Sequence, residues 1–301
     1  RERNNRMITF YQLGQLGRLG NQLFQYAALR GLSLERGYVA KIPHPDTRVW
    51  HGQSCLLGNF NIEAEYYEEV ELLEVKQAYN EPDYMKYDTR FYQIPDNTNL
   101  TGFFQSTLYF KGHEEQIKKE LTPRQTLMNA AEETMNEIKR KHPGYKIVSL
   151  HLRRGDNTDN TDSGQVELNN SYGGEALTKD SFYYQYYKRA TDIFKKEKVK
   201  YLIFSGGKRD SDDNSDDMEW CKRNFMGDEF LFSEGRSTIE DFCLIMSCDY
   251  NIISHVSSFG WWAAYLNSSE NKKVVAPLQY HPDRLDINYR EGFYPEEWIL
   301  V

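Results

Sequence analysis

Hydrophobic and polar residues recur with two different periods along the chain. An apolar run over residues 7–13 predicts a strand, and Leu23, Ala27 and Leu32 then recur at helical spacing. Residues 38–42 predict a second strand. The chain therefore opens as a strand–helix–strand unit, the building block of a parallel sheet.

Residues 43–110 show neither period clearly, and we predict no regular element for them. Helices are predicted over 112–121 and 125–142, and a Pro-Gly pair ends the second of them. We place a domain boundary at this point, between a first domain of residues 1–144 and a second of residues 145–301. The last residues can return to the first domain.

The second half of the chain alternates strands with helices. Strands are predicted over residues 146–152, 200–204, 229–232, 250–254 and 273–276. Helices are predicted over residues 180–198, 216–225, 238–248 and 259–267. This alternation predicts an α/β fold with a parallel sheet that is covered on both faces. Ligands of such sheets bind beyond the carboxyl ends of the strands, so candidate site residues are sought there.

The composition of the chain argues against several classes of protein. The chain has 45 Asp and Glu residues against 37 Lys and Arg, and the formal charge of −8 argues against a nucleic-acid partner. The mean hydropathy of −0.76 and the short apolar runs predict no membrane span. No signal peptide is visible and the four cysteines form no CxxC pair, so we expect a soluble, cytoplasmic protein with reduced thiols. Peripheral membrane association and an upstream anchor stay open.

The strongest chemical signal is the segment Ser-Leu-His-Leu-Arg-Arg-Gly-Asp at the end of a predicted strand. It contains the candidate site residues His151, Arg153, Arg154 and Asp156. A guanidinium leaving water needs a partner, and its shape fits a phosphate with two hydrogen bonds. Because strand side chains alternate, His151 and Arg153 share one face and Arg154 points to the other. One arginine can face a ligand while the other fixes the loop onto Asp156; a purely structural pair is the alternative.

A glycine-rich turn follows the first predicted strand and opens a helix. Its Gly-x-x-Gly-x-x-Gly spacing matches neither the dinucleotide fingerprint nor the phosphate loop. Helix N-termini nevertheless bind anions, and glycine allows a ligand to approach the backbone. Gly20, Asn21 and Gln22 are therefore candidates for binding phosphate or sugar hydroxyls, and Gln25 is a weaker one. Asn21 as a simple helix cap is the alternative.

A third turn follows the strand predicted over 250–254. Ser257 and Ser258 in this turn suit both a helix cap and a phosphate contact. His255 is a candidate site residue, although a lone histidine is more often an ordinary hydrogen-bonded one. Gln105, in the segment Gly-Phe-Phe-Gln-Ser, is a weaker candidate.

Five segments together resemble glycosyltransferase family 11, the α-1,2-fucosyltransferases. They are GRLGNQLFQYA (17–27), GFFQSTLYF (102–110), VSLHLRRGD (148–156), YYQYYKRA (183–190) and DFCLIMSCDYNIIS…SSFGWWAAYLN (241–267). Their order and their spread over nearly the whole chain make the combined pattern specific. The resemblance implies a GT-B-like fold, in which two Rossmann-type domains face a cleft, the first on the acceptor side and the second holding the nucleotide sugar.

The resemblance also implies a reaction. L-Fucose passes from GDP-fucose to the 2-hydroxyl of a terminal β-galactoside, such as lactose or a glycan terminus, with inversion and without a metal or other cofactor. Arg153 maps to the arginine that contacts the diphosphate in the wider fucosyltransferase group, and His151 and Asp156 map to nucleotide-site residues. The remaining donor-binding residues that we expect are Gly20, Asn21, Gln22, Arg154, Ser205, Ser257, Ser258 and Phe259.

This chain departs from the family pattern in two places. The family reads Phe-Ser-Asp-Asp after a strand, whereas this chain reads Phe-Ser-Gly-Gly at residues 204–207, and an insertion precedes Asp216 and Asp217. Either the Asp pair moved with the insertion or its role is lost. The turn before Ser257 carries His255 where the family often has Asn.

The insertion itself contains an Asp-x-Asp sequence at Asp210 and Asp212, a pattern that holds a divalent ion in metal-dependent glycosyltransferases. The glycine and distal glutamate of a calcium loop are absent, and a solvated insertion is the favoured interpretation, so no metal site is predicted.

In this mechanism Arg153 and the helix N-termini at Asn21 and Ser258 stabilise charge on the leaving diphosphate. His151 and Asp156 are candidate bases for the acceptor hydroxyl, and residues 157–174 are a further source of one. A GDP-sugar transferase of another linkage, such as an α-1,6-fucosyltransferase relative, and a non-catalytic glycan- or nucleotide-binding module stay open. A phosphate-ester hydrolase with His151 as nucleophile is less favoured.

Overall fold

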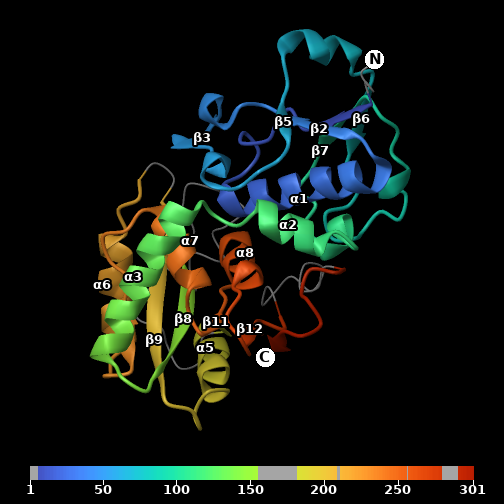
Figure 1. Ribbon diagram of the computed structural model, residues 1–301. Helices are drawn as coiled ribbons and strands as arrows, with labels where there is room; N and C mark the ends of the chain where they lie inside the picture. The colour runs from blue at the N-terminus through green and yellow to red at the C-terminus, as the bar shows by residue number, and fades with distance from the viewer. Residues whose placement is uncertain (1–5, 155–181, 209–210, 256, 280–290) are drawn as a thin grey trace. The chain divides into compact units, whose positions relative to one another are not determined.

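The structure is a computed structural model that describes residues 6–154, 182–208, 211–255, 257–279 and 291–301 (Figure 1). The chain divides into two compact units. The first contains the described residues up to 124 and residues 291–296; the second contains the described residues from 125 to 279 and residues 297–301. The division precedes helix α3 (Gln125–Lys141), whereas the sequence placed it at 144, because α3 packs against α7 (Thr238–Met246) of the second unit.

The first unit contains a five-stranded parallel sheet in the order β5–β2–β1–β7–β6. Its strands are β1 (Met7–Thr9), β2 (Val39–Ile42), β5 (Glu65–Tyr66), β6 (Gln77–Asn80) and β7 (Thr98–Thr101). The first predicted strand is thus shorter than residues 7–13, because the chain turns after Thr9. A separate antiparallel pair consists of β3 (Val49–Trp50) and β4 (Gln53–Ser54).

Short 3-10 helices fill much of the interval for which no element was predicted. They are η1 (Pro45–Thr47), η2 (Leu57–Asn59), η3 (Glu69–Glu74), η4 (Phe91–Gln93) and η5 (Thr107–Phe110).

Helix α1 (Leu19–Arg36) packs against β1 and β2, and α2 (Glu114–Glu120) lies beside α1 (Figure 1). A buried ion pair joins the two helices, with Arg30 Nε and Nη2 donating to Glu120 at 2.8 and 2.6 Å. The Tyr26 hydroxyl donates to the same carboxylate at 2.6 Å. A buried charge needs such a set of partners, so this pair fixes the spacing of α1 and α2.

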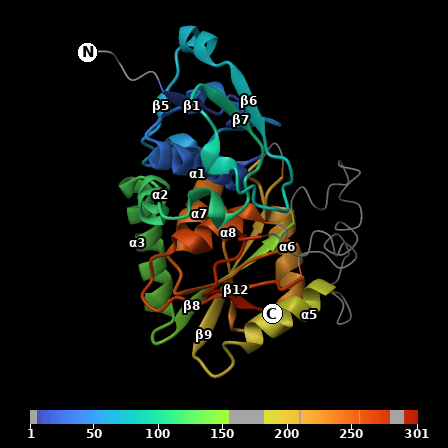
Figure 2. The same ribbon diagram turned by 90° about the vertical axis from the view of Figure 1, so that its right-hand side faces the viewer.

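The second unit contains a six-stranded parallel sheet in the order β10–β9–β8–β11–β12–β13. Its strands are β8 (Lys146–Arg153), β9 (Val199–Gly206), β10 (Phe230–Phe232), β11 (Tyr250–Ile252), β12 (Val274–Ala276) and β13 (Ile299–Leu300). Besides α3 and α7, the described residues of this unit form the helices α5 (Phe182–Asp192), α6 (Ser215–Asn224) and α8 (Ser258–Leu266). In Figure 2, α3 lies on one side of β8 and β9, and α5 and α6 lie on the other.

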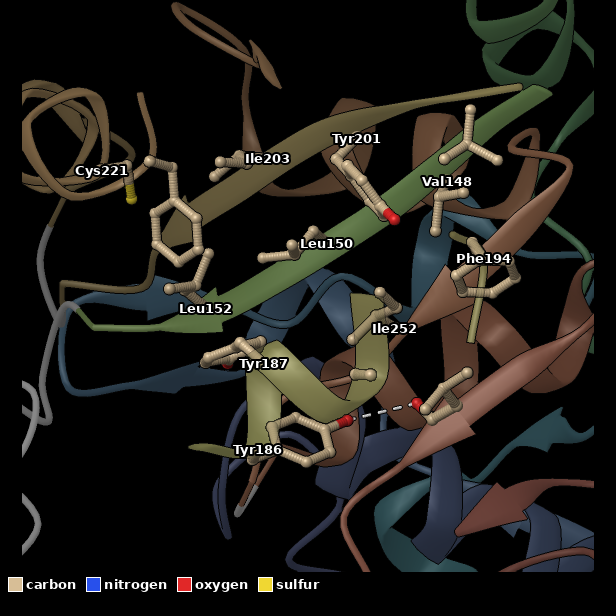
Figure 3. Close-up of a cluster of buried hydrophobic side chains, with 14 of the residues drawn as sticks. Val148, Leu150, Leu152, Tyr186, Tyr187, Phe194, Tyr201, Ile203, Cys221 and Ile252 are labelled. Atoms are coloured by element: carbon tan, nitrogen blue, oxygen red, sulfur yellow. Dashed lines mark hydrogen bonds between the residues drawn. The ribbon is translucent and has the colours of Figure 1, made fainter. Parts of the chain in front are cut away.

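The core on the α5 and α6 side follows the alternation of β8. Val148, Leu150 and Leu152 point to that side and pack against Tyr186 and Tyr187 of α5 (Figure 3). By the same alternation, Ile147, Ser149, His151 and Arg153 point to the opposite face of the sheet, where His151 meets α8. All four cysteines are free and buried. Both predicted parallel sheets are present, so the α/β, GT-B-like fold class with two Rossmann-type domains is confirmed.

Candidate functional site

The strand order of the second unit reverses at β8. From β8 the chain adds β9 and β10 on one side, and then β11, β12 and β13 on the other. Ligands of such sheets bind at this reversal, beyond the carboxyl ends of the two central strands. Arg153 is the last residue of β8, and Ser254 closely follows β11. The Arg153 backbone N–H donates to Ser254 Oγ at 3.1 Å, which joins the two strand ends.

The hydroxyls of two tyrosines of α5 form hydrogen bonds that hold these strand ends in place. Tyr187 donates its hydroxyl to the His151 carbonyl at 2.9 Å and lies 3.3 Å from Ser254 Oγ. The hydroxyl of Tyr186, labelled in Figure 3, lies 2.6 Å from the Ile253 carbonyl and 3.3 Å from that of Val275. Because both tyrosines are buried, their hydroxyls set the backbone that carries Arg153.

Arg154 points to the opposite face of the sheet, as strand alternation predicted. Its guanidinium lies 4.0 Å from the centre of the Trp220 ring, and its Nε donates to Asp217 Oδ1 at 3.1 Å. Both partners belong to α6, and Arg154 and Asp217 are buried. Arg154 therefore fixes α6 against the end of β8, a bracing role that the sequence analysis assigned to one of the two arginines.

The two aspartates that follow the insertion therefore have different surroundings in the structure. Asp217 is the buried partner of Arg154, whereas Asp216 is exposed and pairs with Lys208 at 3.1 Å. Asp217 thus lies at the carboxyl end of β8; whether the Asp pair moved with the insertion or lost its role stays the question that the sequence left open. Asp156, the partner suggested from sequence, lies outside the described residues, as does Asp210.

His151 lies on the side of β8 that faces α8. Its imidazole is buried, with its ring centre 5.6 Å from that of Phe259. A side chain on Gly260 would place a Cβ only 2.6 Å from His151 Nδ1, so this glycine allows α8 to approach the imidazole. Burial, together with the nearby Arg153 charge, lowers the pKa of His151 to about 3. The imidazole is therefore uncharged at neutral pH.

Helix α8 begins at the same edge. Ser257 caps it by accepting the Gly260 N–H at 3.3 Å, and Ser258 and Phe259, both half-buried, form its first turn. A helix N-terminus directs N–H groups and a positive dipole end outward, which favours an anion. His255 instead packs against the rings of α5, with its ring centre 4.5 Å from that of Tyr186.

Two further polar residues, Ser205 and Asp241, are buried near the carboxyl ends of β9 and β10. Ser205 is buried near the end of β9, and its carbonyl accepts from Asn214 Nδ2 at 3.0 Å. Asp241, which the sequence analysis did not single out, is buried on α7 and accepts from Ser233 Oγ at 2.6 Å. Burial raises its pKa to about 7. The signal that could have found Asp241 is its position at the start of a segment shared with the family.

In the first unit the strand order reverses between β1 and β7, and both motifs singled out there follow these strands. Gln25 is fully buried and donates to the carbonyls of Leu16 (2.8 Å) and Gly102 (3.1 Å). Gln105 Nε2 donates to Asn21 Oδ1 at 2.6 Å. These amides therefore join the glycine-rich turn to the segment after β7.

The cap of α1 is Arg18, without a side-chain hydrogen bond, so the alternative of Asn21 as helix cap is wrong. The positive φ of Gly17 (92°) and the closeness of Asn21, 2.4 Å from a Cβ placed at residue 17, explain the glycine at that position. Gln22 is buried and donates to the Gly17 carbonyl at 3.2 Å, and Gly20 is buried in the first turn of α1.

Among the described residues, no group of three or more His, Cys, Asp or Glu side chains is placed to hold a metal ion. In the same part of the chain, no helix is both long and apolar enough to cross a membrane.

Two Rossmann-type units, each with polar residues at the reversal of its strand order, define a two-domain α/β protein. The family model "Glycosyl transferase family 11" matches residues 2–301, and the chain belongs to this family of glycosyltransferases. The predicted family is confirmed.

Curated relatives agree with this assignment. The chain is 25% identical to an alpha-1,2-colitosyltransferase of Escherichia coli, over 95% of this chain and 96% of that protein. It is 26% identical to galactoside alpha-(1,2)-fucosyltransferase 1 of Homo sapiens, over 95% of this chain and 73% of that protein. Among solved structures, the fucosyltransferase NodZ from Bradyrhizobium gives a TM-score of 0.48 at 11% identity, over 86% of this chain and 91% of that one.

Proposed function

We propose that this glycosyltransferase moves L-fucose from GDP-fucose to the 2-hydroxyl of a terminal β-galactoside, with inversion at the anomeric carbon and without a metal. Membership of family 11 and relatives named for α-1,2 transfer support the reaction class. The observation that carries the proposal is the position of Arg153, which ends β8 at the reversal of the strand order and is joined through Ser254 to the segment between β11 and α8.

In this mechanism the second unit holds the nucleotide. Cleavage of the fucosyl–phosphate bond leaves additional charge on the diphosphate, and Arg153 can stabilise it with charge-assisted hydrogen bonds. The N–H groups at Ser258 add the positive end of a helix dipole. Arg154 acts indirectly in this scheme, because its guanidinium is committed to Asp217 and Trp220.

His151 is a weak candidate for the base that takes the acceptor proton. A group with a pKa of about 3 has little affinity for a proton at neutral pH, and its imidazole is enclosed by α8. We therefore propose that His151 positions the edge of β8 and keep Asp156 as the candidate base. Gly20, Asn21 and Gln22 stay predicted donor contacts.

The test is incubation with GDP-fucose and a panel of β-galactosides, followed by mass and linkage analysis. An α-1,2 product that forms equally well in excess EDTA is expected. A product of another linkage would show that the enzyme uses a different hydroxyl of the acceptor. Donor binding without turnover would favour a non-catalytic binding module. A nucleotide-activated colitose belongs in the donor panel, because one relative is named for that sugar.

Substitution tests the role of Arg153 directly. We expect Arg153→Ala to lower kcat by about 10²–10³-fold, the usual cost of removing one preorganised donor to a developing charge. Arg153→Lys should recover part of this loss, because it keeps the charge without the planar fork. Turnover near that of the wild type in Arg153→Ala, with unchanged stability, would remove this residue from the mechanism.

A further inference from the structure

Polar side chains follow three neighbouring strands of the first unit, at one edge of their sheet. Tyr11 follows β1, Arg48 follows β2, and Tyr67 directly follows β5. These strands are adjacent and parallel, in the order β5–β2–β1, so their carboxyl ends share an edge. This is the edge at which sheets of this type bind ligands.

The side chains at this edge are in direct contact. Arg48 Nη1 donates to Gln15 Oε1 at 2.8 Å, and Arg48 Nη2 donates to the Tyr67 hydroxyl at 2.6 Å. The Tyr11 ring meets the Tyr67 ring edge-on, with 5.7 Å between their centres. The guanidinium is therefore held in one orientation by neutral groups that come from separate segments of the chain.

The backbone of the glycine-rich turn also lies against Arg48. Gly14 has a φ of 83°, and a Cβ at that position would lie 2.8 Å from Arg48 Cβ. A glycine is required for this close approach. The turn and the arginine thus form one packed unit, which we call the Arg48 cluster: Tyr11, Gly14, Gln15, Arg48 and Tyr67.

The charge of this cluster is not balanced within the described part of the chain. No described carboxylate lies within 4.0 Å of the Arg48 guanidinium; Asp46, two residues away, is exposed and faces His44 Nδ1 at 3.7 Å. Of the five N–H donors of the guanidinium, two are used by Gln15 and Tyr67, and Nε is buried without a partner among the described residues.

The Tyr11 hydroxyl is also buried, and burial raises its pKa, so it stays protonated as a donor. A half-buried cation whose described partners are all neutral favours an anion, and the planar guanidinium fits a carboxylate with two hydrogen bonds. The tyrosine rings add apolar surface on which the face of a sugar ring can pack.

We propose that the Arg48 cluster binds a carboxylate on the acceptor, which is then an acidic saccharide with a uronate near the galactose that receives the new bond. The proposal rests on the proposed function, because only a transferase needs this second substrate. It predicts that the enzyme prefers a negatively charged acceptor, which membership of the family alone does not predict.

The experiment compares two acceptors that differ in one group. One is lactose, and the other is the disaccharide in which glucuronate replaces its glucose. The kcat/KM of the wild type should be about tenfold higher for the acidic acceptor than for lactose, mainly because its KM is lower. A tenfold effect is what one well-placed charge pair is expected to contribute.

In Arg48→Gln this ratio should fall to about one, because glutamine lacks the charge, and Arg48→Lys should keep part of it. Arg90→Gln is the matched control, since Arg90 is 73% exposed and pairs with Asp88. That variant should keep the wild-type ratio.

Three results would overturn the proposal. In one, the wild type treats both acceptors alike. In another, Arg48→Gln lowers transfer to both by the same factor, which is the signature of a bracing role. In the last, Arg48→Gln raises the KM of GDP-fucose, which places the anion on the nucleotide.

Absence of any transfer by the wild type would contradict the proposed function instead. Saturation-transfer NMR of the acidic disaccharide then tests the cluster alone. Loss of the signal in Arg48→Gln supports the site, and an unchanged signal overturns it.

Discussion

Arg153 and Arg154 are neighbours in sequence, but the structure gives them different surroundings. Arg154 is enclosed between the Trp220 ring and the Asp217 carboxylate, whereas Arg153 ends β8 with its backbone fixed by Ser254. Strand alternation alone predicts this separation. The partner Asp217 was not predictable: the helix that carries it was predicted, but an insertion separates it from β9, and the sequence does not show which strand end that helix packs against.

The hydroxyl of Tyr187 offers a test of how the edge of β8 is positioned. Tyr187→Phe keeps the packed ring but removes the bond to the His151 carbonyl and the contact with Ser254. We expect stability to fall by about 1 kcal/mol and kcat to fall with little change in the KM of the acceptor. Urea denaturation and steady-state kinetics measure the two effects.

Tyr201→Phe is the matched control for Tyr187→Phe. Tyr201 lies in the same core, but its hydroxyl donates to the Thr191 carbonyl, away from the site, at 3.1 Å. A similar loss of stability without a loss of kcat is expected. Equal kinetic effects in both variants would contradict the positioning role of Tyr187.

The raised pKa of Asp241 predicts a pH dependence of stability. An aspartate in the unfolded chain has a pKa of about 3.9, and burial raises that of folded Asp241 to about 7. The folded state therefore holds a proton that the unfolded state has lost, so this residue's contribution to stability falls as the pH rises from about 4 to about 7.

Asp241→Asn removes this titration. The free energy of unfolding of the variant, measured with urea at pH 5 and pH 8, should therefore rise relative to that of the wild type as the pH increases. A difference that is the same at both pH values would show that the carboxyl is not buried as described.

At the scale of elements, burial explains which strands the sequence reveals. The hydrophobic run of β8 marks a strand covered on both faces, and it was predicted almost to its ends. β6 is mostly exposed and polar, and β7 has Leu100 as its one large apolar residue, so neither shows a period. The carboxyl edge of the second sheet was therefore predictable, and most of the first was not.

For Gly260 in helix α8, packing and helix propensity predict opposite effects of a substitution by alanine. Alanine is favoured over glycine inside a helix by about 1 kcal/mol, so propensity alone predicts that Gly260→Ala is stabilising. The new Cβ would lie 2.6 Å from His151 Nδ1, and we expect a net destabilisation of about 1–3 kcal/mol instead. Thermal and urea unfolding measure its sign.

Gly58→Ala is the control, because the atom nearest to its new Cβ is 3.9 Å away. It should change stability little. A more stable Gly260→Ala protein would mean that His151 does not lie against α8.

At the scale of the whole molecule, the last described segment contributes to both units. Phe293 stacks on Phe24 of the first unit with 6.0 Å between ring centres, and the Gly292 carbonyl accepts the Thr107 N–H at 2.9 Å. Trp298 packs against Trp261 of the second unit at 5.4 Å, and β13 pairs with β12. Residues 291–296 group with the first unit and residues 297–301 with the second, whereas the sequence expectation was that the last residues return to the first domain.

Substitutions in this segment should therefore affect different units. Phe293→Ala is expected to speed amide exchange in α1, and Trp298→Ala to speed it in α8, each by removing a buried aromatic side chain at a cost of about 3–5 kcal/mol. Hydrogen-exchange mass spectrometry resolves the two helices. Identical exchange patterns in the two variants would show that the units unfold as one.

The returning segment also sets the order in which the protein can mature during synthesis. The first unit lacks the ring that covers Phe24 until residue 293 has left the ribosome, and the second lacks its edge strand until residues 299–300 have followed. Neither unit can therefore finish folding before these residues have been synthesised. Until then the nascent protein leaves an apolar surface and an open sheet edge for a chaperone to shield.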